Sequence, residues 1–199
     1  MVNQASEIVQ QILSLESSYS TTLVAIDGKG GAGKSTLANI LASQLETAGR
    51  RVDIVHFDDF YLPSSLRMKG EGAEKPIGGD FDWERLRAQV LEPLRDGRKA
   101  RFERYDWCKD MLTEAQHILP GAIVIIEGIF SSRDELAAKY DVRIWVDCPR
   151  QLRLKRGIER DGESYRDRWE QDWMPSEDRY VENHQPIDRA DFVVSGETS

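Results

Sequence analysis

The sequence is poor in cysteine, in histidine and in long apolar segments, and each shortage excludes a class of protein. Its 199 residues include only two cysteines, Cys108 and Cys148, and three histidines. The cysteines form no C-x-x-C pair and the histidines lack metal-like spacing, so we expect neither a disulfide framework nor a zinc site. No apolar segment approaches the roughly 18 residues of a membrane span, and no signal peptide is evident at the N-terminus. We therefore predict a cytoplasmic protein with no membrane partner.

Positive charge is also in the minority. The chain has 27 lysines and arginines against 35 acidic residues, a formal net charge of -8. Such a chain is not expected to bind nucleic acid, although a local basic pocket for phosphates is compatible with it. The length is typical of one domain, and residues 1–199 are predicted to form a single domain. The oligomeric state stays open, and a homo-oligomer is one of the outcomes considered.

The most specific motif is a glycine-rich loop over residues 28–35, Gly-Lys-Gly-Gly-Ala-Gly-Lys-Ser, which has the G-x-x-x-x-G-K-S pattern of a P-loop. A buried strand is predicted before it, at 22–26, and a helix after it, ending near Gly49. Backbone N–H groups in this context bind phosphate, Lys34 would reach the β- and γ-phosphates of ATP, and the Ser35 hydroxyl would help to hold Mg²⁺. The residues predicted to bind the nucleotide are Gly28, Gly30, Gly31, Ala32, Gly33, Lys34, Ser35 and Thr36.

The rest of the chain predicts strands that alternate with helices. This alternation is typical of an α/β fold, here a P-loop NTPase fold with a central five-stranded parallel sheet flanked by helices. The further strands are predicted at 51–57, 122–126, 142–146 and 191–194. Helices are predicted at 8–15, 82–96, 133–139, 150–160 and 164–183, the last of them broken near Pro175. Residues 100–107 and 114–119 predict a small outlying hairpin, and 62–79 a long loop of functional importance.

Acidic residues stand where the second and third strands are predicted to end. Asp58 and Asp59 follow the second strand, and Glu127 closes the third. The carboxyl ends of parallel strands meet at one edge of a sheet, which brings these residues near the P-loop. Glu127 is predicted to hold Mg²⁺ together with Ser35, directly or through a water, and Asp58 to be the base that activates the attacking hydroxyl. Such a base contributes about 10²–10⁴-fold to the rate.

A basic segment follows the fourth strand. Arg153, Arg156 and Arg160 are spaced i, i+3 and i+7, so they share one face of a helix. One interpretation is a solvated helix face, and the other is a lid over about 150–162 whose guanidinium groups neutralise the transferring phosphoryl group. The acidic character of the rest of the chain favours the lid, with Arg156 and Arg160 as catalytic cations.

Taken together, these motifs resemble the uridine kinase and phosphoribulokinase family of P-loop kinases. The resemblance covers about residues 23–160 and rests on the P-loop, Asp-Asp-Phe-Tyr at 58–61, Phe-Asp at 81–82, Tyr-Asp at 105–106, Ile-Glu-Gly-Ile at 126–129 and Arg-x-x-Arg-x-x-x-Arg-Asp at 153–161. It implies an ATP- and Mg²⁺-dependent phosphotransferase that acts on a hydroxyl of a small molecule. It also implies that Asp58 is the base and that Glu127 lies beside Mg²⁺. Tyr61 and Tyr105 are similar to substrate-pocket positions, within acceptor-side segments at about 61–82 and 100–119.

Two departures leave the acceptor open. No histidine follows Tyr105, Asp106 and Trp107, and the acidic block before Phe81 is reduced, so pyrimidine specificity does not follow from the resemblance. A nucleoside-like acceptor is the first hypothesis, and a sugar phosphate or a pantothenate-like alcohol is the alternative. The P-loop also matches ATPases that act as dimerising partner switches, in which the early lysine, here Lys29, reaches across a dimer. The Glu-Gly pair at 127–128 and the arginine segment are not typical of that class.

The tryptophans are expected to divide between the pocket and the core. Trp107 follows the Tyr-Asp pair and is a candidate to stack on a planar substrate. Trp145 lies within a predicted strand and is expected in the core. Trp169 and Trp173 are one helical turn apart, which favours core packing over a stacking platform.

Overall fold

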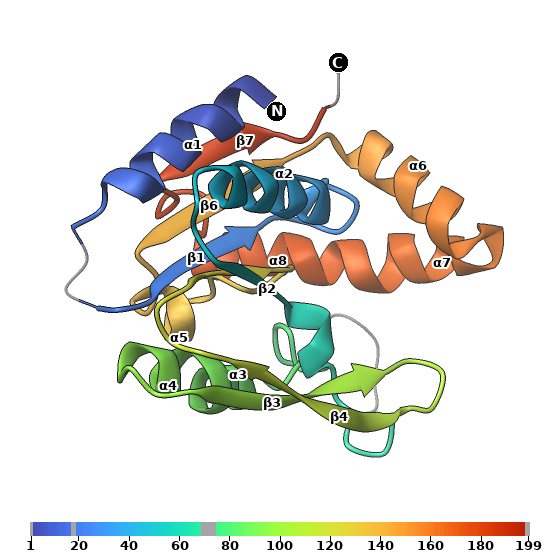
Figure 1. Cartoon of the computed structure of the whole chain (residues 1–199). Helices are drawn as coiled ribbons and strands as arrows, with labels where there is room; N and C mark the ends of the chain where they lie inside the picture. The colour runs from blue at the N-terminus through green and yellow to red at the C-terminus, as the bar shows by residue number, and fades with distance from the viewer. Residues whose placement is uncertain (1, 17–18, 69–74, 198–199) are drawn as a thin grey trace.

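A five-stranded parallel sheet lies at the centre of the fold (Figure 1). The computed structural model of the chain describes residues 2–16, 19–68 and 75–197, so residues 69–74 of the loop expected at 62–79 lie outside it. The strands of the sheet are β1 (Thr22–Asp27), β2 (Val52–His56), β5 (Ile123–Glu127), β6 (Val142–Asp147) and β7 (Phe192–Ser195). Their order is β2-β5-β1-β6-β7, which confirms the predicted parallel sheet.

The two central strands, β1 and β5, are buried over their whole length. Their near-continuous apolar sequences suit a parallel sheet that is covered on both faces. Ile26 and His56 both pair in register with Glu127, so β1, β2 and β5 end at the same level. The segments that follow these three strands therefore begin next to one another, and this is the edge at which the site forms.

Helices cover both faces of the sheet. One face is packed by α1 (Val2–Ser14) and α2 (Lys34–Thr47) through an apolar cluster that is continuous with β1, β5 and β6 (Figure 1). The other face is covered by α3 (Trp83–Leu86), η2 (Arg87–Leu91), α4 (Glu92–Arg95), α5 (Asp134–Ala137) and part of α8 (Met174–His184). The predicted N-cap is confirmed, since the Asp82 side chain accepts a hydrogen bond of 2.9 Å from the backbone N–H of Arg85. Trp145 is 2% exposed and lies in the core as predicted.

After β6 the chain is mostly helical, through α6 (Arg150–Asp161), η3 (Glu163–Tyr165), α7 (Arg166–Arg168), η4 (Trp169–Trp173) and α8. The prediction of a break near Pro175 is wrong, because the chain stays helical from Arg166 to His184. A proline has no N–H and cannot form the usual bond within a helix. Here the element before it, η4, is a π-helical turn in which Met174 N–H donates to the carbonyl of Trp169, five residues back. This wider turn accommodates Pro175 without ending the helix.

The predicted hairpin is present below the sheet in Figure 1, formed by β3 (Ala100–Asp106) and β4 (Met111–Ile118). It packs against η1 (Phe57–Phe60), the short helix that follows β2, through rings of Phe60 and Phe102 whose centroids lie 5.3 Å apart. Within the described ranges, none of the helices combines the length and apolar character that crossing a membrane requires.

Candidate active site

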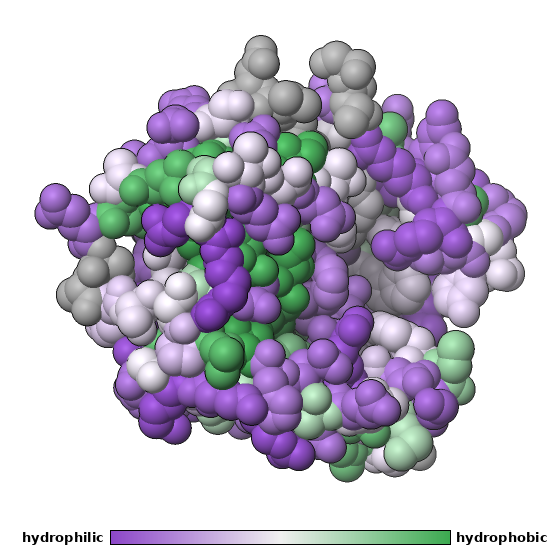
Figure 2. All heavy atoms as spheres, viewed as in Figure 1, coloured by the Kyte–Doolittle hydropathy of each residue, from purple (hydrophilic) through white to green (hydrophobic). Residues whose placement is uncertain are grey.

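A cavity of about 900 Å³ opens between the P-loop, η1, the hairpin and the helices that follow β6. Figure 2 shows a hollow on this face of the molecule with many polar side chains around it. Of the residues predicted to bind the nucleotide, the cavity wall contains Gly30, Gly31, Gly33, Lys34, Ser35 and Thr36. Gly28 and Ala32 are buried and are not part of this wall. Gly28 has φ 149°, and a Cβ there would stand 2.5 Å from the carbonyl oxygen of Val146, so only glycine fits.

The loop curls over the start of α2. The ammonium of Lys34 donates to the carbonyl of Lys29 at 3.1 Å, and the N–H of Ala32 donates to the same carbonyl at 3.1 Å. Ser35, in the first turn of α2, donates from its hydroxyl to Oε1 of Glu127 at 3.1 Å. The loop, the lysine and the strand-end carboxylate are therefore brought together at the N-terminus of a 14-residue helix, where an anion is favoured.

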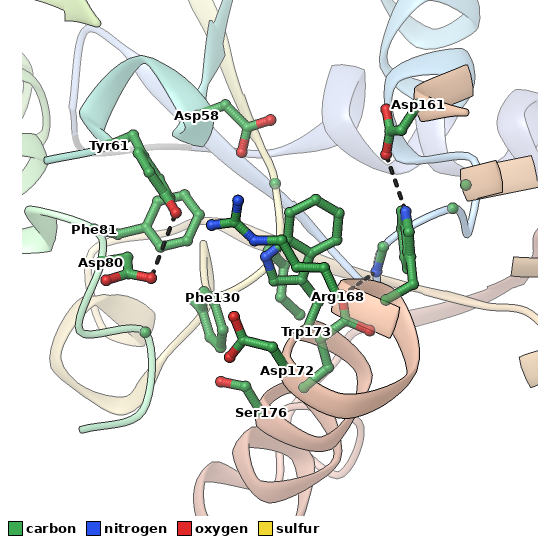
Figure 3. A pocket seen from close by; sticks show the side chains of 18 of the residues that line it. Asp58, Tyr61, Asp80, Phe81, Phe130, Asp161, Arg168, Asp172, Trp173 and Ser176 are labelled. Atoms are coloured by element: carbon green, nitrogen blue, oxygen red, sulfur yellow. Dashed lines mark hydrogen bonds between the residues drawn. The ribbon is translucent and has the colours of Figure 1, made fainter. Parts of the chain in front are cut away.

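The two predicted carboxylates have opposite pKa shifts. Burial favours the neutral form of Glu127, but the hydrogen bond from His56 Nδ1, 2.6 Å away, and the charge of Lys34 hold its pKa below the ordinary value. Asp58 lies in η1 with its carboxylate directed into the cavity (Figure 3). The surrounding protein and the charge of Glu127 raise the pKa of Asp58, and Lys34 and Arg160 only partly oppose them. Asp59 is instead buried in an ion pair with Arg104 at 2.8 Å, away from the cavity wall.

The structure separates the three arginines that share a helix face in the sequence. Arg153 is 3% exposed and bonds to Glu177 of α8 at 2.9 Å and to the carbonyl of Cys148 at 3.1 Å. Arg156 donates to the carbonyl of Gly31 at 3.2 Å, and Arg160 pairs with Asp161 at 2.7 Å. Only Arg156 and Arg160 belong to the cavity wall.

Three predicted substrate residues form an aromatic cluster in the part of the cavity wall that comes from the hairpin and the residue after η1. The ring centroid of Tyr61 lies 4.5 Å from that of Trp107 and 5.5 Å from that of Tyr105. Phe81 adds an edge-on contact to Tyr61 at 4.9 Å. Burial and the negative charge of Asp80 raise the pKa of Tyr61 to about 12, so its hydroxyl stays a donor near neutral pH.

Several residues of this wall were not predicted from the sequence. Arg67 pairs with Asp110 of the hairpin turn at 3.2 Å, and Lys75 pairs with Asp80 at 3.2 Å. Arg67 and Lys75 come from the loop predicted at 62–79, which has no periodic pattern of apolar residues. Only the charged residues of this long loop could have indicated them in the sequence. From the helical side the wall gains Arg168, Asp172, Trp173 and Ser176, which Figure 3 shows around the same space as Asp58 and Tyr61.

Trp169 and Trp173 both line the cavity but differ in burial, although the sequence predicted core packing for both. Trp169 is 2% exposed, and its ring packs against Gly30 and Gly157. Trp173 is only half-buried and its ring faces the cavity, so the prediction is wrong for this residue. The two rings still contact each other edge to face, with centroids 5.1 Å apart, and no periodicity in the sequence indicates the π-helical turn that contains them.

The ligand set of the site fits Mg²⁺ rather than a transition metal. The described ranges hold no group of three or more histidine, cysteine, aspartate or glutamate side chains able to bind a metal. The donors present at the P-loop are the Ser35 hydroxyl and the Glu127 carboxylate. Two hard oxygen ligands suit Mg²⁺, which keeps several waters and takes further oxygens from phosphates.

Comparison with known proteins agrees with this geometry. A family model described as the phosphoribulokinase/uridine kinase family matches residues 23–195. The uridine kinase of Staphylococcus epidermidis RP62A is 31% identical over 144 residues, 71% of this chain and 69% of the relative. The uridine kinase of Limosilactobacillus reuteri DSM 20016 is 27% identical over 155 residues, 75% and 69% of the two chains.

Solved structures extend the similarity to nearly the whole chain. A structure described as a "possible uridine kinase" from Bacillus stearothermophilus superimposes with a TM-score of 0.78 at 25% identity, covering 96% of this chain and 97% of the other. A D-glycerate 3-kinase from Cryptococcus neoformans var. grubii has the same fold at a TM-score of 0.59 and 17% identity, covering 95% and 87%.

Proposed function

Because the chain belongs to the phosphoribulokinase/uridine kinase family and is a phosphotransferase that acts on an alcohol group, we propose that it transfers the γ-phosphoryl group of ATP to a hydroxyl of a small metabolite. One observation carries this proposal: Asp58 lines the same cavity as Lys34 and Ser35 of the P-loop and as the aromatic cluster. A carboxylate between a phosphate loop and an acceptor chamber is where a phosphoryl acceptor must be deprotonated.

On the nucleotide side, residues 28–36 would bind the phosphates through backbone N–H groups and the ammonium of Lys34. Ser35 and Glu127 would hold Mg²⁺, directly or through a water, and Glu127 is suited to this role because its lowered pKa keeps it ionised. Bound Mg²⁺ neutralises charge on the β- and γ-phosphates. Arg156 and Arg160 would add positive charge from α6. We propose that the lid consists of the part of 150–162 that follows Arg153, because Arg153 itself is buried in an ion pair with Glu177.

At the transfer point, Asp58 would take the proton of the acceptor hydroxyl. A base is most effective when its pKa approaches the working pH, and the surroundings of Asp58 shift its pKa in that direction. The charge of the Arg160 guanidinium acts to lower the pKa of Asp58, which supports a role for Arg160 beside the group being transferred.

On the acceptor side, a nucleoside-like molecule with a planar ring is the acceptor that the wall supports best. Tyr61, Tyr105 and Trp107 offer ring faces and edges for stacking. The paired charges of Lys75 with Asp80 and Arg67 with Asp110 offer hydrogen bonds to hydroxyl groups. We further propose that this kinase works in the cytoplasm as a single domain, with ATP and a small-molecule hydroxyl acceptor as its substrates.

A dimerising ATPase switch is less well supported. In that class the early lysine of the loop reaches a partner chain, whereas Lys29 forms an ion pair with Asp178 of its own α8. The pair holds the ammonium against the same chain.

The test is ADP release with Mg²⁺ and ATP across nucleosides, ribosides, sugar phosphates and small alcohols, with Lys34→Ala as the matched control. We expect one acceptor class to raise turnover well above the rate without acceptor, and Lys34→Ala to abolish the increase. An ATP-dependent dimer with no acceptor stimulation would contradict the proposal and favour the switch. Turnover by Lys34→Ala close to that of the unchanged protein would contradict the role of the P-loop.

A further inference from the structure

Glu177 of α8 contacts the P-loop at the wall of the cavity. Its side chain is nearly buried, and the residue is 5% exposed. Oε1 accepts a hydrogen bond of 2.9 Å from the backbone N–H of Gly30. Oε2 accepts one of 2.9 Å from Arg153 of α6. A carboxylate is tolerated at such a depth only when it is paired and hydrogen-bonded, and both conditions are met here.

The loop is packed closely against this carboxylate. A Cβ on Gly30 would stand 2.7 Å from Oε1 of Glu177 and 2.9 Å from the ring of Trp169. A Cβ on Gly31 would stand 2.6 Å from the carbonyl oxygen of Arg153. Gly30 and Gly31 are therefore packed against residues from three helical segments, and the hydrogen bond that the Gly30 N–H donates to Glu177 fixes the direction of this N–H.

The same helix holds the rest of the first half of the loop. Asp178 pairs with Lys29, and the hydroxyl of Tyr180 donates to Asp27, the last residue of β1, at 2.6 Å. These contacts come from residues some 150 positions further along the chain. The loop's curl is thus a property of its contact with α8 as well as of its glycines.

We propose that Glu177 is a positioning residue for the nucleotide: by fixing the N–H of Gly30 it holds the P-loop in the curl that presents its other N–H groups to the phosphates. The inference rests on the proposed function only for its kinetic consequence, since nucleotide binding by the loop needs no acceptor. Donors that are oriented before the ligand arrives bind it without a reorganisation cost. Glu177 acts through the loop, by the hydrogen bond that it accepts from Gly30.

The test compares two double variants that differ only in the acceptor offered to Gly30. Arg153→Leu with Glu177→Gln removes both charges but keeps a side-chain oxygen, whereas Arg153→Leu with Glu177→Leu removes the oxygen as well. Removing both charges together avoids an unpaired buried charge, so both proteins are expected to fold. The probe is Mg·ADP, measured by calorimetry, with the melting temperature recorded for each protein. Glu182→Gln, at an exposed position of α8, controls for loss of a carboxylate from the helix.

We expect the glutamine pair to bind Mg·ADP within about threefold of the unchanged protein and the leucine pair about tenfold more weakly. The KM for ATP should follow the same order, while the KM for the acceptor stays the same in both. Equal Mg·ADP affinities in the two pairs would overturn the proposal. Hydrogen exchange at the Gly30 amide of the unchanged protein gives a second measurement that needs no variant. Protection is expected, and an unprotected amide would also overturn the proposal. Normal Mg·ADP binding without turnover on any acceptor would count against the kinase proposal and not against this one.

Discussion

The two halves of the cavity are built in different ways. The nucleotide half is one continuous loop set on the ends of buried strands. Beside it, the ion pair between Arg153 of α6 and Glu177 of α8 has side chains that are 3% and 7% exposed. The acceptor half is assembled from the hairpin, two loop segments and η4. Its ion pair Arg67 with Asp110 has side chains that are 20% and 41% exposed, and Trp107 is 57% exposed.

This difference shows where the site can change. Removing one partner of a buried ion pair leaves an unpaired buried charge and strongly destabilises the fold. A partly exposed ion pair contributes little to the stability of the fold. The phosphate-binding half is therefore tied to the core of the fold. The acceptor half can exchange residues at low cost to the fold, as expected of loops that carry specificity on a rigid scaffold.

The largest effect should come from the carboxylate at the boundary of the two halves. Asp58→Asn keeps the shape of the side chain but removes the base, so turnover with the true acceptor should fall by about 10²–10⁴-fold. The affinity for Mg·ATP should stay within about threefold, because the P-loop is untouched. Steady-state kinetics and calorimetry measure the two quantities. Unchanged turnover would remove Asp58 as the base.

The pH dependence should identify which carboxylate limits the reaction. The base works in its deprotonated form, and the pKa of Asp58 is raised while that of Glu127 is lowered. As the pH falls, the rate should therefore drop by about tenfold per pH unit below the pKa of Asp58, while Glu127 is still ionised. The measurement is kcat against pH at saturating substrates. Asp58→Asn should lose this acidic limb, and an unchanged limb in that variant would assign it to another group.

A smaller effect is expected at the exposed aromatic wall. Trp107→Ala should raise the KM for a planar acceptor by roughly three- to tenfold, because it removes the ring that contacts Tyr61 and Tyr105. The KM for ATP should not change. Trp107→Phe is the matched control and should keep most of the affinity. An equal rise in both KM values for the alanine variant would show that the two halves are not separable in this way.

The smallest effect is expected at Asp110, which connects the hairpin turn to the loop segment that contains Ser64. Its carboxylate accepts hydrogen bonds from Ser64 N–H at 2.8 Å and from the Tyr105 hydroxyl at 2.5 Å. Asp110→Asn keeps an acceptor oxygen and loses only the charge beside Arg67, so the acceptor KM should rise about threefold or less. Hydrogen bonds from Ser64 and Tyr105 hold the pKa of Asp110 well below its usual range, so the effect should not vary with pH near neutrality. A pH-dependent effect would point to a different group.

What the sequence determined by itself is the scaffold and the meeting of the P-loop with the end of β5. The P-loop is a contiguous motif. The apolar residues of β1 and β5 predict that both strands are buried, as they are. That Glu127 meets Ser35 follows from the rule that parallel strands end at a common edge, and the structure places their side chains 3.1 Å apart.

Tertiary structure alone decided the partners of the charged residues. The sequence places Arg153 on the same helix face as Arg156 and Arg160. Arg153 becomes buried and pairs with Glu177 because α8 packs against α6. Local periodicity likewise does not predict two ion pairs of the cavity wall, Arg67 with Asp110 and Lys75 with Asp80. It also does not predict that the ring of Trp173 faces the cavity. The physical reason is the range of the interaction. Strand and loop propensities act between neighbours along the chain, whereas an ion pair or a cavity wall depends on which distant segments the packed core brings within a few ångströms.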